Sequence, residues 1–302
     1  MSTNDSSRRD GDRSLGFTLP ARNVRGRAVR LDASVDAILA AHAYPEPIAK
    51  LLAEALVLTA MLGALLRDEG GQLTLQARGE GGPCSLLVAD YREGELRGYA
   101  ALDLDRRFPA ADSETLAGFF GKGYLAITLD QTASAERYQG IVELGDTTLE
   151  AAAGNYFAQS EQLPTIIRLA AVRKADGHWT AGGLLVQQLS RKELGAARLH
   201  VEASEQHAAD QQHVAALVGT LSDTELTDVE LPLENLLWRL FHEEEVHAFP
   251  PELLSRGCRC SVEHITRVLK QFSEEERVEM RNGDGLVAVD CEFCARQFLL
   301  DV

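Results

Sequence analysis

The sequence lacks a long apolar run, and this limits where the protein can work. The longest largely apolar stretch, Ala55–Leu66, is shorter than the roughly 18 residues that a membrane-spanning helix needs. The first 14 residues are polar and charged, without the apolar stretch of a secretory signal. We therefore expect a cytoplasmic protein in a reducing compartment that does not enter a membrane.

Basic residues are also scarce. The chain has 30 Lys and Arg against 46 Asp and Glu, which gives a formal net charge of −16. Proteins that bind nucleic-acid backbones need clustered Lys and Arg, because much of their affinity comes from releasing counterions. Anionic membrane surfaces attract the same residues. The composition therefore argues against a general nucleic-acid binder and against binding to anionic membranes.

The usual motifs of nucleotide-binding and hydrolytic enzymes are missing as well. Gly121-Lys122-Gly123 lacks the glycine spacing and the following Ser or Thr of a phosphate loop, so we expect it to form a turn. Asp103, Asp105 and Asp130 are expected to be solvated turn carboxylates. Ser160 has no G-x-S-x-G context. The sequence thus predicts neither ATP binding nor an enzyme.

Cysteine is rare but concentrated. Four of the five cysteines lie in the last 45 residues, as a C-x-C pair, Cys258 and Cys260, and a C-x-x-C pair, Cys291 and Cys294. Two close pairs of soft thiolates suit a tetrahedral metal ion, and zinc is the expected occupant, one per chain. The spacer between the pairs is longer than the roughly 15–20 residues of a zinc ribbon. We therefore expect it to contain structure of its own.

Other roles for these cysteines are two structural disulfides or four unrelated thiols. A reducing compartment disfavours stable disulfides, and chance does not readily place a pair at both ends of the spacer. His242, His247 and His264 lie nearby, but four cysteines already complete a tetrahedron, so we expect exposed or docking histidines. Cys84 stands alone and is expected to be a small half-buried residue.

Residues 15–200 have the pattern of one α+β domain with mostly antiparallel strands, preceded by a disordered tail over 1–14. Apolar residues recur at helical spacing from Ile48 to Leu66. Asn155–Arg168 is expected to be helical or mixed, with an interruption at Pro164. The expected strands are Leu73–Ala77, Cys84–Tyr91, Glu95–Leu102, Tyr124–Leu129, Tyr138–Leu144 and His178–Leu189.

Residues 201–256, the linker, contain twelve acids and two bases. Apolar residues nevertheless recur there at helical spacing, which predicts amphipathic helices that dock on the core domain. Ser222–Glu225 has the form of a capping box. Repulsion among the acids should oppose docking, so we expect it to be marginal. The predicted docking residues are Leu217, Leu221, Leu236, Leu237, Leu240 and Phe241, with Val214 and Val218 in the first stripe.

Residues 257–302 are expected to form a small unit around the metal. Ser261 can cap a helix that carries Ile265, Val268, Leu269 and Phe272. A capping box, Ser273–Glu276, begins a second helix, and Leu286–Asp290 and Gln297–Leu300 are expected to form a hairpin with the C-x-x-C at its turn. About 45 residues bury too little surface to fold alone. Metal binding, worth about 10–16 kcal/mol, would then hold the unit together.

Several stretches together resemble a known family. They are Leu73–Gln76, Arg97-Gly98-Tyr99, Tyr156–Thr165, Ala181–Gln187, Leu236–Glu245, Cys260-Ser261 and the four-cysteine tail. From about residue 16 to the end, in this order, they resemble the redox-regulated bacterial heat-shock chaperone family, the 33 kDa chaperonin. The polar extension 1–14 and Cys84 are not marks of that family.

The resemblance implies a holdase, a chaperone that binds unfolding proteins without ATP. The resemblance also implies that the reduced form binds zinc and is inactive, and that in the oxidised form the zinc unit unfolds, the linker loosens and the chain dimerises. We expect the disulfides Cys258–Cys260 and Cys291–Cys294, because sequence neighbours have the higher effective concentration once the unit has unfolded. The alternatives are a zinc-ribbon nucleic-acid binder or regulatory protein, which the acidic linker disfavours, and a metal-dependent enzyme, which a closed four-thiolate site disfavours.

Overall fold

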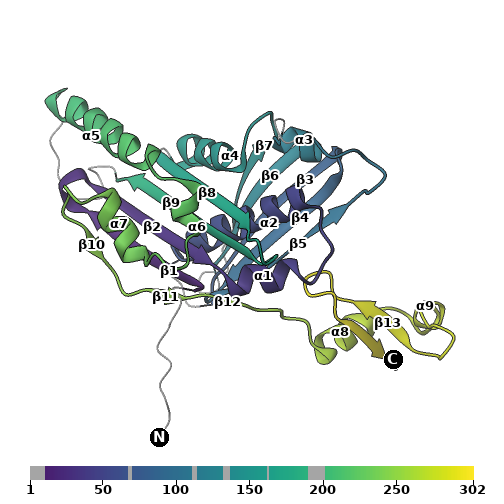
Figure 1. Cartoon of the computed structure of the whole chain (residues 1–302). Helices are drawn as coiled ribbons and strands as arrows, with labels where there is room; N and C mark the ends of the chain where they lie inside the picture. Colours follow the sequence, from purple (N-terminus) through teal and green to yellow (C-terminus); the bar gives the residue numbers. More distant parts are fainter. Residues whose placement is uncertain (1–10, 67–69, 111–113, 132–136, 162, 190–200) are drawn as a thin grey trace, which may run out of the picture.

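Two six-stranded sheets form the body of the computed structural model, which describes residues 11–66, 70–110, 114–131, 137–161, 163–189 and 201–302. One long helix lies between the two sheets, and further helices cover the face of the first sheet that points away from this helix (Figure 1). A small C-terminal unit stands apart from this body. The predicted α+β fold, with a mostly antiparallel core, a helical linker and a small four-cysteine domain, is confirmed.

The first sheet has the order β10-β1-β2-β9-β8, with β11 also paired to β1, and all its pairs are antiparallel. Every residue of strand β9, which lies between β2 and β8, is buried, because apolar layers pack on both faces of this sheet. Its strands are β1 (Arg13–Leu19), β2 (Val24–Leu31), β8 (Thr165–Arg173), β9 (Trp179–Gln188), β10 (His247–Ala248) and β11 (Glu252–Leu253).

The second sheet has the order β12-β5-β4-β3-β6-β7, and β12 is parallel to its neighbour β5 while the other pairs are antiparallel. Residues on its inner face are buried and those on its outer face are partly exposed, which is the alternation of a half-buried sheet. Its strands are β3 (Gln72–Gly81), β4 (Cys84–Arg92), β5 (Glu95–Leu102), β6 (Gly121–Asp130), β7 (Arg137–Glu143) and β12 (Ser255–Arg256).

Helix α2 (Glu46–Gly63) fills the space between the two sheets. Fourteen of its eighteen residues are buried, because the helix is apolar on nearly every side and has a sheet on each flank. The shorter helices α1 (Ala33–Leu39), α3 (Leu116–Phe120) and α4 (Leu149–Tyr156) complete this main core.

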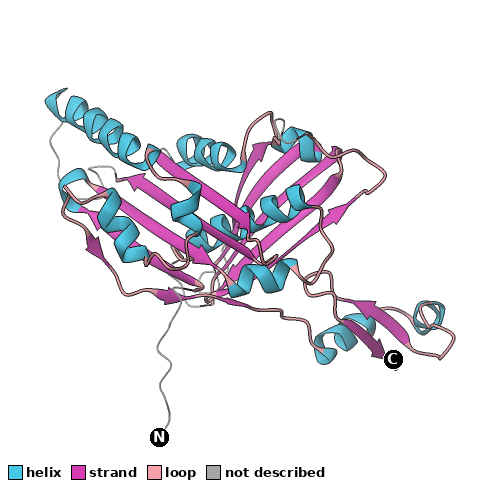
Figure 2. Cartoon of the chain, in the orientation of Figure 1, coloured by secondary structure: helices cyan, strands magenta, loops and turns pink. Residues whose placement is uncertain are grey.

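The linker forms three helices and then an extended strand-like segment. Helices α5 (Val201–Gly219), α6 (Asp223–Thr227) and α7 (Leu233–Leu240) lie on the outer face of the first sheet (Figure 2). Beyond Leu240 the linker is no longer helical: residues 247–256, the strap, contain β10, β11 and β12 and run along the edges of both sheets. Pro250 and Pro251 within the strap cannot continue a helix, which accounts for the change.

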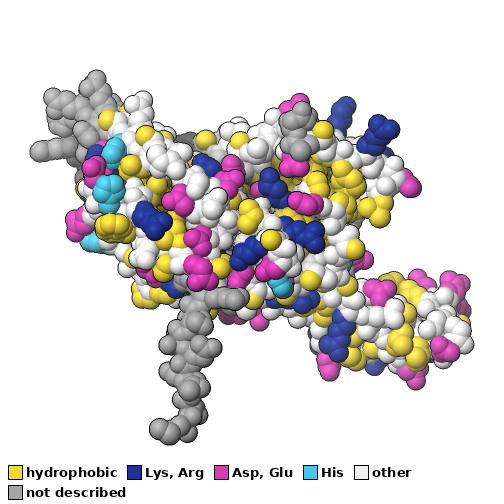
Figure 3. Space-filling model, viewed as in Figure 1, with side chains coloured by type: hydrophobic (Ala, Val, Ile, Leu, Met, Phe, Trp, Pro, Cys, Tyr) yellow, Lys and Arg dark blue, Asp and Glu magenta, His cyan; other side chains and the backbone are white. Residues whose placement is uncertain are grey.

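The C-terminal unit, residues 257–302, consists of α8 (Val262–Leu269), α9 (Glu274–Glu279) and the hairpin β13 (Val287–Asp290) and β14 (Gln297–Leu300). In Figure 3 it stands out from the body as a lobe with acidic side chains at its far end. Ser261 caps α8 and Ser273 with Glu276 forms a capping box on α9, as predicted. The helix ends at Leu269, so Phe272, which was predicted to lie on it, follows its end. Val268 and Phe272 stay 41% and 39% exposed, because the unit is too small to cover them.

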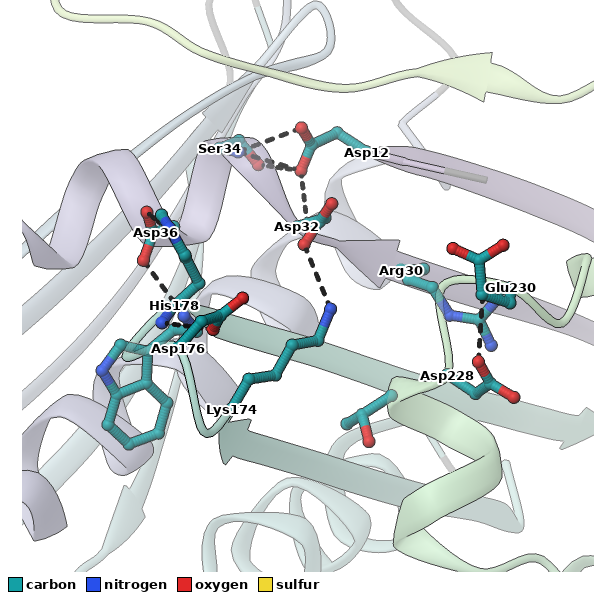
Figure 4. A network of polar contacts seen from close by, with 12 residues as sticks. Asp12, Arg30, Asp32, Ser34, Asp36, Lys174, Asp176, His178, Asp228 and Glu230 are labelled. Carbon is teal, nitrogen blue, oxygen red and sulfur yellow. Dashed lines mark hydrogen bonds and ion pairs between the residues drawn. The ribbon is translucent and has the colours of Figure 1, made fainter. Parts of the chain in front are cut away.

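The boundary predicted for the N-terminal tail is wrong by a few residues. Residues 1–10 lie outside the described residues, but Arg13 and Ser14 belong to β1. The carboxylate of Asp12 accepts hydrogen bonds from the backbone N–H groups of Asp32 (2.8 Å) and Ser34 (3.1 Å), as Figure 4 shows. These bonds and the pairing of β1 with β2 hold the chain in place from Asp12 onwards, which is closer to the N-terminus than the polar composition indicated.

Two local predictions in the core are also wrong. Gly121-Lys122-Gly123 begins β6 and pairs with Gly79–Gly81, where the glycines allow the two backbones to approach closely. Thr165–Arg168, expected to be helical or mixed, opens strand β8. Among the described strands β8 pairs with β9 alone, and its first residues are half-buried, so its sequence lacks the clear alternation that marks a strand. No helix among the residues described is long and apolar enough to cross a membrane.

Candidate metal centre and linker interface

The four C-terminal cysteines meet at one point. The Sγ atoms of Cys258, Cys260, Cys291 and Cys294 all lie within 4.8 Å of one another. The Cys258 sulfur is 3.2 Å from that of Cys260 and 3.6 Å from that of Cys291, and the sulfurs of Cys260 and Cys294 are 3.5 Å apart. Four thiolates about 2.3 Å from a tetrahedral zinc ion would be about 3.8 Å from each other. The arrangement of sulfurs therefore fits such an ion.

Backbone hydrogen bonds place each cysteine pair. The N–H of Gly257 donates to the carbonyl oxygen of Leu96 on β5 (2.9 Å), so Cys258 follows directly from the edge of the second sheet. A Cβ atom at position 257 would lie 2.6 Å from the side chain of Glu95, a clash that glycine avoids because it has no Cβ. The other pair closes the β13–β14 hairpin, where the N–H groups of Cys294 and Ala295 both donate to the carbonyl oxygen of Cys291.

The sulfurs differ in their tendency to ionise. Burial acts to raise the pKa of Cys258, but hydrogen bonds from the backbone of Cys260 and from the neighbouring thiols outweigh it and hold this pKa below its ordinary value. Burial, together with the neighbouring thiols, raises the pKa of Cys260 and of Cys291. Cys258 therefore ionises more readily than Cys260 or Cys291.

The neighbouring histidines and Cys84 are not part of this centre. Within the described residues, the four cysteines are the only group of three or more His, Cys, Asp and Glu side chains positioned around a common point. His242 lies against the carbonyl oxygen of Arg239, and His247 against the carboxylate of Glu245. Cys84 is fully buried in the main core, and burial raises its pKa to about 12. It is therefore a packing residue with little thiolate.

The candidate docking residues of the linker lie in a second apolar cluster, between the linker helices and the outer face of the first sheet. Leu221, Leu236, Leu237, Leu240 and Phe241 are buried there, whereas Leu217 is only partly buried at its margin. Trp238, on the opposite side of α7, is 68% exposed.

Aromatic and aliphatic side chains of the sheet face these linker residues. The rings of Phe17 on β1 and Phe241 lie 5.6 Å apart. Leu15, Leu184 and Val186 belong to the same cluster. Fully burying a Leu or Phe side chain contributes about 1.5–3 kcal/mol, so this cluster is the main attraction between linker and core.

Arg30 makes contacts with the linker that the sequence did not reveal. It is fully buried on β2, where Nε donates to the carbonyl oxygen of Leu226 (3.1 Å) and Nη2 to that of Glu225 (3.0 Å). Nη1 donates to the carbonyl oxygen of Leu231. The end of a helix carries partial negative charge on its free carbonyl groups, which suits a guanidinium. Arg30 therefore holds the C-terminal end of α6 and the turn that follows it.

Gly182 on β9 lies next to Arg30 in the sheet and beneath the same carbonyl group. A Cβ atom at Gly182 would be 2.0 Å from the carbonyl oxygen of Leu226. Any larger residue would therefore push α6 off the sheet. This close approach explains why position 182 of the strand is a glycine.

Arginines of the core also pair with the acids of the linker. Nη1 of Arg22 is 2.7 Å from Oδ1 of Asp210 on α5, and its Nη2 is 2.9 Å from Oε1 of Glu244, which follows α7. This guanidinium holds the pKa of Glu244 below its ordinary value. Further pairs join the core to the linker at Arg13–Glu234, Arg27–Glu252 and Arg168–Asp223.

These ion pairs change the expected charge balance of the linker. Repulsion among its acids was expected to oppose docking, but these five acids each lie beside a core arginine. Most of the pairs are partly exposed, and each contributes about 0–1 kcal/mol. The ion pairs offset the repulsion among the linker acids and fix where the linker lies on the core. The apolar cluster supplies most of the attraction between linker and core.

Comparison with known proteins gives one consistent result. The sequence profile of the family described as Hsp33 protein matches residues 12–301. The 33 kDa chaperonin of Caulobacter vibrioides is 40% identical over 296 residues, which cover 94% of this chain and 93% of that protein. The 33 kDa chaperonin of Yersinia pestis is 36% identical over 279 residues, with 92% and 88% covered.

A solved structure agrees with these relatives at the level of the fold. The crystal structure of the 33 kDa chaperonin (heat shock protein 33 homolog) from Thermotoga maritima superposes with a TM-score of 0.78 and 24% sequence identity, over 96% of this chain and 94% of that one. With the family profile spanning nearly all of the sequence and relatives at 36–40% identity, the chain belongs to the Hsp33 family of chaperones.

Proposed function

We propose that this protein is a holdase that oxidation switches on: it binds unfolding proteins without ATP, and its reduced, zinc-bound form is inactive. The observation that carries the proposal is the cluster of four free cysteines at the end of a strap that pairs with the edges of both sheets. A change at the sulfurs can therefore reach the linker through the backbone.

Cys258, Cys260, Cys291 and Cys294 would hold one zinc ion in the reducing cytoplasm. Bound zinc would keep the sulfurs as thiolates and fold the C-terminal unit around them. The apolar core of this unit contains only four buried side chains, those of Leu269, Val287, Phe298 and Leu300. Such a core is too small to keep about 45 residues folded by itself.

The chemistry of activation belongs to the sulfurs. Peroxide transfers one oxygen atom to a thiolate, which gives a sulfenic acid and hydroxide; the neighbouring thiol then displaces water and forms a disulfide. Two peroxide molecules thus convert the four cysteines into the pairs Cys258–Cys260 and Cys291–Cys294. The first disulfide leaves too few thiolates to hold the metal ion, so the unit unfolds, and the two remaining cysteines then pair as sequence neighbours.

Unfolding of the unit would pass to the linker through the strap. The N–H group of Ser255 donates to the carbonyl oxygen of Gly94, just before β5, and that of Gly257 to the carbonyl oxygen of Leu96 on β5. Leu254 is buried in the main core. With Cys258 no longer fixed, these edge bonds lose their C-terminal support. The helices that precede the strap, α6 and α7, would then leave the first sheet.

Release of the linker would expose the apolar surface that binds clients. On the linker this surface includes Leu217, Leu221, Leu236, Leu237, Leu240 and Phe241, and on the sheet Leu15, Phe17 and Leu184. We propose the same surface for the dimer expected of the activated form. In this division the core runs from Asp12 to residue 200, residues 201–256 are the linker and residues 257–302 the redox-switch domain.

Light scattering of a heat-denatured test protein tests the proposal. The reduced, zinc-loaded chain should leave aggregation unchanged, whereas the chain treated with peroxide should suppress it in the absence of ATP. Reduction with a dithiol and zinc should restore the inactive state. Equal suppression by both forms, or none by either, would contradict the proposed switch.

A further inference from the structure

The residues that stand between the paired cysteines point to the outer face of the second sheet. Arg259 separates Cys258 from Cys260, and its Nη1 donates to Oε1 of Gln72 on β3 (2.7 Å). Phe293 lies between Cys291 and Cys294, and its ring packs edge-to-face on that of Tyr99 on β5, with centroids 5.0 Å apart. Both cysteine pairs therefore contact the core through their intervening residues.

Arg97 provides the second contact of the Phe293 ring. Its guanidinium carbon lies 4.0 Å from the centroid of that ring, a cation–π arrangement. Arg97 is itself fixed by Asp90 on β4: Nε donates to Oδ2 over 2.8 Å, and Nη2 lies 2.6 Å from the same oxygen. Asp90 is only 3% exposed, so the ion pair holds the guanidinium in one orientation.

One row of polar side chains connects the two contacts. Nε2 of Gln72 donates to the hydroxyl of Thr74 (3.1 Å), and this hydroxyl donates to Oδ1 of Asp90 (2.7 Å). Thr74, Asp90 and Arg97 are direct neighbours across β3, β4 and β5. The row therefore runs from the partner of Arg259 to the partner of Phe293 without a break.

We propose that Arg259 and Phe293 form a two-point anchor on this row of side chains. The anchor sets how readily the four cysteines release their metal ion and react with oxidant. The proposal rests on the proposed function, since it requires that the cysteines hold zinc. Both contacts need the two cysteine turns in their folded positions at the same time. Whatever stabilises that arrangement raises metal affinity and lowers the population of opened units, because binding and folding are linked.

Gln72 and Arg97 are then positioning residues for the metal centre, although they belong to the core and touch no sulfur. Substituting them tests the anchor without changing a ligand. Arg97→Ala and Gln72→Ala should each speed zinc transfer from the reduced full-length chain to an excess of a chromogenic chelator, by about tenfold for a lost charged or cation–π contact. The same variants should release zinc faster when peroxide is added.

Arg78 offers a matched control. It is an exposed arginine on the same face of β3, so Arg78→Ala removes equal charge without touching the anchor and should transfer zinc at the wild-type rate. Arg97→Lys retains a positive charge near Asp90 but loses the planar face, and should remain fast. Phe293→Tyr keeps an aromatic ring and should stay slow, whereas Phe293→Ala should be fast.

A double-mutant cycle separates the anchor from general loss of stability. If Arg97 and Phe293 act through their contact, Arg97→Ala combined with Phe293→Ala should be no faster than the faster single variant. Rates that multiply, or single variants indistinguishable from wild type, would overturn the anchor while leaving the proposed function intact. A wild-type chain that takes up no zinc would overturn both.

Discussion

Nε of Arg30 on β2 donates a hydrogen bond of 3.1 Å to the carbonyl oxygen of Leu226 on α6, and so joins residues that are 196 positions apart. The same oxygen lies over Gly182, the neighbour of Arg30 in the sheet. The linker helix is thus held by a buried cation at a point where its backbone nearly touches that of the core. Docking at this point depends on a glycine as much as on the apolar stripes.

A methyl group at Gly182 should release the linker without altering the linker itself. Gly182→Ala would place Cβ 2.0 Å from the Leu226 carbonyl oxygen, so α6 must move away. Overpacking of this kind costs about 1–3 kcal/mol. The reduced variant should suppress aggregation in light scattering where the reduced wild type does not. Gly145→Ala, at a glycine with open space around it, should behave as wild type.

Charge on the buried face of α7 should have the same effect. Leu237 is 2% exposed. Leu237→Glu or Leu240→Glu would bring a carboxylate into the apolar cluster, and burying that charge without a partner would destabilise the docked state. Hydrogen exchange should become fast over residues 223–240 in the reduced, zinc-bound chain, and holdase activity should appear. Trp238→Glu, on the exposed side of the same helix, is the control. If Leu237→Glu undocked the linker but stayed inactive until oxidised, linker release would not be the activating step.

Metal binding should depend on each thiolate of the cluster. The reduced chain should contain about one zinc ion, and Cys291→Ser should lose most of it, because a serine hydroxyl is a poor zinc ligand. Cys84→Ala should retain full zinc content, since Cys84 is buried in the main core. Metal analysis of the purified reduced proteins measures both. Full zinc affinity in Cys291→Ser would exclude the four-cysteine site.

Disulfide connectivity should follow sequence proximity. In the folded unit the Cys258 sulfur is 3.2 Å from that of Cys260 and 3.6 Å from that of Cys291, so distance alone hardly selects a partner. After unfolding, partners one or two residues away have far higher effective concentration than partners about thirty away. Peptide mapping should therefore find Cys258–Cys260 and Cys291–Cys294. A majority of Cys260–Cys291 links would contradict this connectivity, and a majority of Cys258–Cys291 and Cys260–Cys294 links would mean that the disulfides form before the unit opens.

Glu54 should make the stability of the core depend on pH. It lines a cavity of about 460 Å³ with Glu114, Glu150, Asp223 and the cations Lys50 and Arg168. Burial, with a smaller contribution from the carboxylates of Glu150, Asp223 and Glu114 and opposed by Lys50, raises the pKa of Glu54 from 4.5 to about 7. The folded chain therefore keeps a proton that the unfolded chain releases, and stability falls as pH rises from 4.5 through about 7.

Replacing that carboxyl should remove the dependence. Glu54→Gln stays neutral, so it should raise the free energy of unfolding at pH 8 by up to about 3 kcal/mol and by much less at pH 5. Thermal unfolding of the reduced chain at the two pH values measures the difference. Glu80→Gln, at an exposed site on β3, should shift neither midpoint. An equal gain for Glu54→Gln at both pH values would show that its charge is not the cause.

Several features of the candidate site could be predicted because they depend on residues close in the chain. The spacing of Cys258 with Cys260 and of Cys291 with Cys294 already aims two thiols at one point. The caps at Ser222, Ser261 and Ser273 need only the next three residues. The stripe from Leu236 to Phe241 shows at helical spacing which side of α7 is buried. Turn geometry and helical period are local, so the sequence alone determined these features.

Tertiary structure decided which distant residues meet. The contacts of Arg30 with Leu226, Arg259 with Gln72 and Arg97 with Phe293 each join parts of the chain separated by more than 180 positions. Nothing near Arg30 in sequence distinguishes it from other arginines in its strand. Pro250 and Pro251 keep the strap from being helical, but which sheet edges it pairs with is decided by the fold. Such contacts depend on how the sheets stack, which no short stretch of residues encodes.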